Sequence, residues 1–105
     1  MNLSVRYVDL AETEVVEAWE WHEHQKTGLG DQFLDAVKAT VDRAERWPDS
    51  GSPAAWNSGG EIIERKMATR GFTWAIRYRV IDSELIVMAV HHQTRHPGHG
   101  ADRRL

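Results

Sequence analysis

The hydrophobic pattern is clearest in the last third of the chain. From residue 72 to 80 every even position is apolar or aromatic, whereas the odd positions include Arg77 and Arg79. A period of two is typical of a strand with one buried face, so both arginines are predicted to lie together on the opposite, wetter face. Residues 85–90 are apolar at every position, which predicts a strand covered on both faces and central in its sheet. A polar turn at 81–84 joins the two strands into a hairpin.

An amphipathic helix is predicted near the N-terminus, from Asp9 to about Lys26, after a short alternating strand at residues 3–7. Asp9 and Glu12 have the spacing of a capping box at a helix N-terminus. Four residues at helical spacing form the expected buried stripe: Ala11, Val15, Trp19 and His22.

A second helix is predicted from Asp31 to Trp47, where Pro48 ends it. The short link at 28–30 contains two glycines, so the two helices are expected to form an antiparallel hairpin. Trp47 is assigned to the core together with the expected buried side of this helix: Phe33, Leu34, Val37, Thr40, Val41 and Ala44.

The remaining residues complete a single domain. Residues 48–60 are rich in Pro, Ser, Gly and Asn and are predicted to be a loop, and residues 61–67 are predicted to be a strand. The order is then β-α-α-β-β-β over residues 1–105. Three consecutive strands with short links favour an α+β fold, with an antiparallel four-stranded sheet and the N-terminal helical hairpin packed on it.

The composition is that of an ordinary globular domain, but charge is distributed unevenly along the chain. Residues 1–59 hold 11 acidic and 5 basic side chains, whereas residues 60–105 hold 5 acidic and 8 basic. This asymmetry suggests a local acidic or anionic partner for the C-terminal half. The absence of cysteine excludes disulfides and thiolate metal sites. No signal pattern or bilayer-length apolar run is present, so a cytoplasmic protein without membrane contact is expected.

Several short strings, taken in order, resemble the RelE/ParE superfamily of toxins from bacterial type II toxin–antitoxin systems, especially its ParE-like, plasmid-stabilisation branch. They cover roughly residues 3 to 98, and their joint order is more specific than any one of them. The strings are Gly28-Leu29-Gly30 before Phe33-Leu34, Trp47-Pro48 with Gly51, Arg65, Phe72 through Tyr78-Arg79-Val80, and Val90-His91 with Arg95-His96-Pro97.

The resemblance implies a toxin that stops growth and is neutralised by a cognate antitoxin, with which it could form a hetero-oligomer. ParE-like members poison DNA gyrase by binding it, whereas RelE-like members cleave messenger RNA within the ribosome. A third reading is a non-toxic binding module of the same fold. One fold hosts both activities, so the target must be argued from the site. The gyrase reading is preferred here because the match to the ParE-like branch is closer.

The ribonuclease alternative requires cations for the phosphate and groups that move protons. Arg65, Arg77, Arg79 and Arg95 are the candidate cations, and His91 or His92 is the candidate acid or base. The structural alternative is that the arginines pair with carboxylates and the histidines are satisfied at the end of a strand. Tyr78 falls on the apolar face and is not expected to reach such a site.

The gyrase reading requires only a binding surface. Trp21 lies off the helical stripe and Trp56 lies in the predicted loop, so one or both are candidates for partner contact. Three C-terminal arginines would supply charge to a partner surface: Arg95, Arg103 and Arg104. No cofactor and no metal site are expected, since the histidines at 92, 96 and 99 lie in a glycine-containing tail without cysteine.

Overall fold

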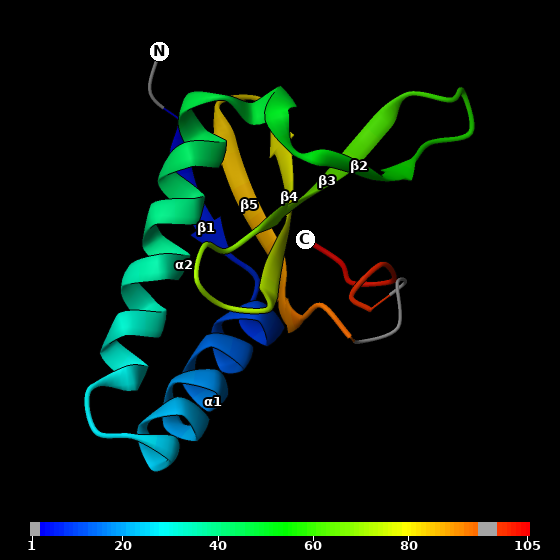
Figure 1. The fold of residues 1–105 in the computed structure, drawn as a ribbon. Helices are drawn as coiled ribbons and strands as arrows, with labels where there is room; N and C mark the ends of the chain where they lie inside the picture. Colours follow the sequence, from blue (N-terminus) through cyan, green and yellow to red (C-terminus); the bar gives the residue numbers. More distant parts are fainter. Residues whose placement is uncertain (1–2, 95–98) are drawn as a thin grey trace.

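The computed structural model describes residues 3–94 and 99–105 of the 105-residue chain. In this part of the chain, two helices pack on a single sheet (Figure 1). The elements, in chain order, are β1 (Ser4–Tyr7), α1 (Asp9–Gln25), α2 (Leu29–Arg46), a 3₁₀ turn (Pro48–Ser50), β2 (Ser52–Trp56), β3 (Ile62–Ala68), β4 (Trp74–Ile81) and β5 (Glu84–His92).

The sheet has five strands in the order β1-β5-β4-β3-β2, and not the four that were predicted. The additional strand is β2, which lies in the segment predicted to be a loop. It contains Pro53 and small residues without alternation, and its antiparallel pairing with β3 is broken by two register shifts. Strand β1 pairs in parallel with β5, and β4 lies antiparallel on the other side of β5. The apolar run 85–90 is therefore interior, as predicted.

Both helices cover one face of the sheet and enclose the core. Phe33 and Val37 of α2 belong to one apolar cluster with Ile76 and Tyr78 of β4. The predicted buried side of α2 is confirmed except that Leu34 is half-buried. The assignment of Trp47 to the core is wrong, because its side chain is 59% exposed. Helix α2 ends at Arg46 and Trp47 has non-helical dihedral angles, so helical spacing no longer gives its direction.

The start of α1 also differs from the prediction. Val8 is the N-cap and no side chain caps the helix, so the predicted capping box is wrong. The backbone N–H of Val8 donates to the carbonyl of Val87 at 3.0 Å, which ties the entry of the helix directly to β5. Asp9 and Glu12 instead lie in the first turn, where negative charge is favourable to the helix dipole. Of the predicted α1 stripe, Ala11 and His22 are buried, whereas Val15 and Trp19 are half-buried.

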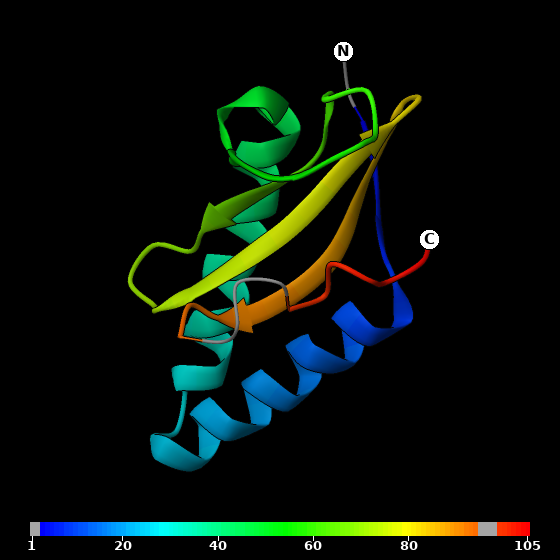
Figure 2. The same ribbon diagram turned by 90° about the vertical axis from the view of Figure 1, so that its right-hand side faces the viewer.

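The C-terminal residues 99–105 lie on the opposite side of the sheet from α2 (Figures 1 and 2). Their approach to the sheet is close at Gly100, where an added Cβ would lie 2.7 Å from the Cβ of Ala89. Gly100 also has a φ of 82°, which a side chain would disfavour. The tail thus depends on a glycine to lie flat against β5. Within the described residues, neither helix combines the length and hydropathy needed to cross a bilayer.

Candidate functional site

The far face of the sheet carries a buried carboxylate between two arginines. Glu64 of β3 is 1% exposed and accepts a hydrogen bond from Nε of Arg77 at 2.5 Å and from Nε of Arg79 at 2.9 Å. Nη2 of Arg77 also contacts the same carboxylate. Because Arg77 and Lys66 are direct partners in the β3–β4 register, all of these side chains lie on the face away from the helices.

Arg77 does not lie on a wet face, so that part of the sequence prediction is wrong. The residue is only 1% exposed, since Glu64 pairs with its guanidinium and the tail lies over it. Its Nη1 points toward the carbonyl oxygen of His99 and its Nη2 toward that of Ala54, each at 3.4 Å. Arg79 remains more accessible, with 19% of its side chain exposed. One carboxylate, Glu64, therefore offsets one of the two positive charges of this arginine pair.

Arg65 is used to hold the connection after α2. Its Nη1 donates to the carbonyl oxygens of Asp49 at 3.0 Å and Gly51 at 2.8 Å. From the adjoining strand, the buried hydroxyl of Tyr78 donates to the carbonyl of Pro48 at 2.6 Å and accepts from the N–H of Gly51 at 3.2 Å. Burial raises the pKa of Tyr78, which keeps this hydroxyl protonated. Both side chains fix a turn, and Tyr78 faces the core as predicted.

The two candidate histidines at the end of β5 have different surroundings. Nδ1 of His92 contacts the Thr94 hydroxyl at 2.7 Å and accepts from the N–H of Thr94, and its Nε2 contacts the Thr73 hydroxyl at 2.7 Å. Its ring therefore ties the loop before β4 to the end of β5.

His91 is almost fully buried, at 2% exposure. Its Nδ1 donates to the carbonyl of His92 at 3.0 Å, which leaves Nε2 as an acceptor without a partner among the described residues. Burial lowers the pKa of His91, and the nearby charges of Lys66 and His99 lower it further. The ring is therefore neutral near pH 7 and would be costly to protonate.

A second carboxylate, Glu14 of α1, holds the tail. It pairs with Arg103, whose Nη1 lies 2.5 Å from Oε1 and whose Nη2 lies 3.1 Å from Oε2. Nε2 of His99 lies 2.6 Å from Oε2, and the N–H of Val90 donates to Oε1 at 3.0 Å. Burial alone would raise the pKa of Glu14, but the hydrogen bonds from Arg103, His99 and Val90 lower it overall. Glu14 therefore carries a negative charge and links α1 to both β5 and the tail.

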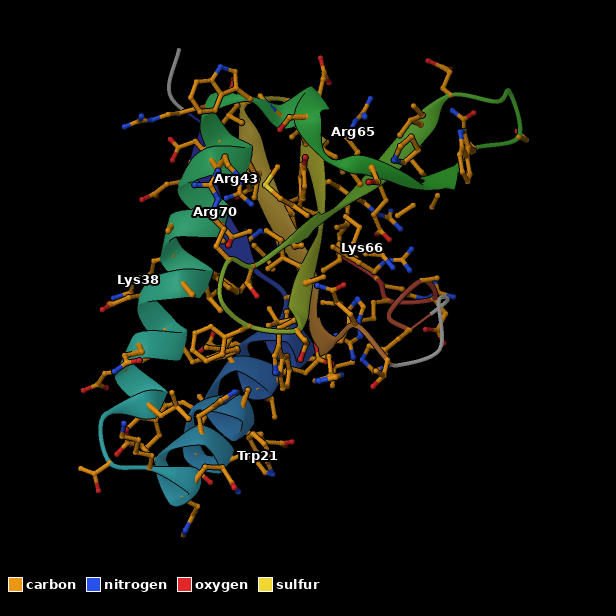
Figure 3. The ribbon with its side chains drawn as sticks, viewed as in Figure 1. Trp21, Lys38, Arg43, Arg65, Lys66 and Arg70 are labelled. Atoms are coloured by element: carbon orange, nitrogen blue, oxygen red, sulfur yellow. The ribbon has the colours of Figure 1, made fainter. Side chains whose placement is uncertain are left out.

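The predicted partner-contact residues are distributed over several surfaces. Trp21 and Trp56 are both exposed, and only Trp21 lines a groove, of about 840 Å³, between α1 and the ends of β4 and β5. Arg104 is exposed, whereas Arg103 is largely covered by its pairing with Glu14. Arg95 lies outside the described residues, together with His96. Figure 3 places Trp21 at the opposite end of the molecule from Arg65.

The sequence reasoning missed the acidic partners that organise this face. Glu64 lies in a strand that was only coarsely placed, and Glu14 lies on a helix with several other glutamates. The position of Glu64 in its strand was a usable signal. Glu64 lies two residues before Lys66, which pairs with Arg77, so its side chain shares a face of the sheet with Arg77 and Arg79. Among residues 3–94 and 99–105, no cluster of three His, Asp or Glu side chains is arranged to hold a metal ion.

Chemically, the far face is an ion-pair network in which one carboxylate, Glu64, engages two guanidinium groups. Of the candidate cations, Arg77 and Arg79 are engaged by Glu64 and Arg65 donates to backbone carbonyls. His91 is buried, and His92 attaches the loop before β4. Arg65 and Arg79 also line a groove of about 570 Å³. The groove beside Trp21 is separate from it and combines aromatic walls with the acidic side of α1.

Comparison with solved structures identifies the architecture. A structure of the chromosomal ParDE TA system from P. aeruginosa matches with a TM-score of 0.59 at 12% identity, covering 86% of this chain and 95% of that chain. A double arginine-to-alanine mutant of the E. coli toxin RelE in the free state matches with a TM-score of 0.62 at 14% identity. The match covers 90% of this chain and 86% of that chain. No family model and no curated protein sequence matches the chain. The chain therefore has the fold of RelE and ParE toxin structures, as its sequence resemblance implied.

Proposed function

We propose that this protein is the toxin of a type II toxin–antitoxin system, that a cognate antitoxin neutralises it, and that it acts by binding DNA gyrase. The fold it shares with the ParDE and RelE structures supports the first part. A module that acts by binding requires a shaped surface and no assembled set of catalytic groups.

The observation that carries the choice of target is the position of Glu64. Its carboxylate engages both Arg77 and Arg79, two of the four candidate cations of the ribonuclease alternative. Metal-free RNA cleavage requires uncompensated positive charge at the phosphate and a group that moves protons. Here Glu64 offsets one of the two positive charges and holds both guanidinium groups in ion pairs, and His91 is buried with a lowered pKa. These features favour binding over RNA cleavage.

Induction of the chain alone in bacterial cells tests the proposal. Plasmid supercoiling and the ends of messenger RNA are measured in the same culture, with Arg79→Ala as the variant that would disable an RNA-cleaving site. The expected result is growth arrest with relaxed plasmid or gyrase-linked DNA breaks and intact messages. Cuts within translated codons that disappear with Arg79→Ala would overturn the gyrase target. Normal growth would overturn the toxin proposal and favour a binding module.

A further inference from the structure

The groove beside Trp21 has an aromatic floor and one acidic wall. The α1 side of the groove is formed by Glu14, Glu17, Ala18 and Trp21. These four positions recur at three- and four-residue steps, so they form one stripe along the helix. The opposite side comes from the loop before β4, the first residue of β4 and the end of β5, including Phe72, Trp74 and His92.

Trp21 differs from the other exposed tryptophans in what surrounds it. Trp21, Trp47 and Trp56 are exposed to nearly the same extent, at 57%, 59% and 56%. Only Trp21 lines the groove. Its ring makes an edge contact with His22 at a centroid distance of 4.9 Å, and His22 stacks on the buried Phe33 at 4.5 Å. The exposed indole is thus supported from beneath by the core, which limits the entropy lost when a partner contacts it.

The charge of the groove indicates what kind of side chain it accepts. Glu17 lies one helical turn before Trp21, is exposed and has no hydrogen-bond or ion-pair partner among the described residues. Glu14 is already engaged by Arg103 and His99. No lysine or arginine lines the groove. A cation over the indole would gain both a cation–π contact and an ion pair with Glu17.

We propose that this groove binds a segment of the antitoxin that places an arginine or lysine over Trp21 and against Glu17. A neighbouring apolar side chain of the same segment packs on Phe72 and Trp74. Charge complementarity with the acidic wall selects this partner over an acidic one. The identity of the partner as antitoxin rests on the proposed function, whereas the chemistry of the segment follows from the groove itself.

Selection of peptides from a random display library on the immobilised protein tests the chemistry directly. The recovered peptides are expected to pair a basic residue with an aromatic or large aliphatic one. Binding of the strongest synthetic peptide, measured by fluorescence anisotropy, should weaken about ten-fold or more with Trp21→Ala and with Glu17→Lys. The matched controls Trp47→Ala and Trp56→Ala should change it by no more than about two-fold.

A charge exchange separates a direct contact from a loss of folding. Because Glu17 is exposed, Glu17→Lys should not affect folding. A peptide in which Glu replaces the basic residue should bind the Glu17→Lys variant more tightly than the original peptide does, and should not bind the wild type better. Acidic peptides from the selection, or equal losses with all three tryptophan variants, would overturn the proposal. Self-association of the wild type that is lost with Trp21→Ala would also overturn it, by assigning the groove to a second copy. Absence of growth arrest in cells would overturn the toxin function and leave the peptide result standing.

Discussion

On the helix side of the sheet, Ile76 and Val87 belong to an apolar cluster with Phe33, whereas on the tail side Glu64 lies between Arg77 and Arg79. Both sides are buried, and β4 contributes alternate residues to each. The first side is stabilised by contacts that do not depend on direction, because removal of apolar area from water is the main contribution. The second side depends on matched charges and on hydrogen bonds with fixed geometry.

The difference predicts how each face responds to change. An apolar core tolerates a small loss of volume at moderate cost, since neighbouring side chains partly relax. A buried charge cluster tolerates the loss of one partner poorly, because the remaining charge stays desolvated. The tail side should therefore be the sensitive side, although it contains fewer side chains.

The largest effect is expected from Glu64→Gln. Glutamine keeps the shape of the side chain but leaves Arg77 and Arg79 without a counter-charge, so the free energy of unfolding should fall by about 3–5 kcal/mol. Urea unfolding of the purified protein measures this. The helix-side comparison is Ile76→Val, which should cost only about 0.5–1.5 kcal/mol.

The control for Glu64→Gln is the exposed ion pair between Arg6 and Glu84, whose atoms lie 3.3 Å apart. Glu84→Gln should change the free energy of unfolding by less than about 1 kcal/mol. If Glu64→Gln lowers the free energy of unfolding as little as Glu84→Gln does, the ion pairs of Glu64 do not stabilise the tail side. The two faces would then not differ in the way proposed.

A smaller effect is expected from Glu14→Gln, which weakens the attachment of the tail. The free energy of unfolding should fall by about 1–3 kcal/mol, as for loss of a charged hydrogen-bond partner. Hydrogen exchange at residues 99–105 should rise more than elsewhere, whereas exposed Asp102→Asn should leave it unchanged. The lowered pKa of Glu14 adds a test by pH, because its stabilisation is present above the ordinary value of 4.5 and is lost as the pH falls below it. Unchanged hydrogen exchange at residues 99–105 would show that Glu14 does not hold the tail against the sheet.

The smallest effect is a change in the pH dependence of stability, assigned to His91. Because the pKa of His91 is lowered in the folded state, the unfolded state binds the proton more readily. The contribution of His91 to stability is therefore fully present above pH 6.5 and declines as the pH falls below that value. His91→Phe should flatten the decline between the ordinary and the lowered pKa. Thermal unfolding across this range measures it, with exposed His24→Gln as the control. Equal slopes for His91→Phe and wild type would show that another group titrates.

Much of the fold could be predicted because the strands and helices carry strong periodic patterns. Alternation located β4, the apolar run located β5 as an interior strand, and helical spacing identified Phe33, Val37 and Ala44 as buried. Strand β2 was missed because its pairing is made by the backbone and by the neighbouring β3, while Pro53 and its alanines carry no alternation.

The candidate site was less predictable because periodicity gives the direction of a side chain and not what covers it. Arg77 was placed on the correct side of β4, opposite Ile76. Its burial depends on Glu64 and on the position of His99, which are 13 and 22 residues away in the sequence. The exposure of Trp21 was anticipated from its place off the helical stripe. The roles of the predicted catalytic and partner residues remain predictions.

The hydrogen bond from Val90 to Glu14 has a consequence for association between copies of the chain. Strand β1 stops at Tyr7, opposite Val87, while β5 continues to His92. Beyond Tyr7 the edge of β5 would present a free backbone N–H, and exposed edges of apolar strands invite pairing with strands of other molecules. The carboxylate of Glu14 occupies that N–H and places a charged side chain beside the edge. At Val90, where β1 no longer pairs with it, the most apolar strand of the protein therefore has a charged side chain in place of an unpaired N–H.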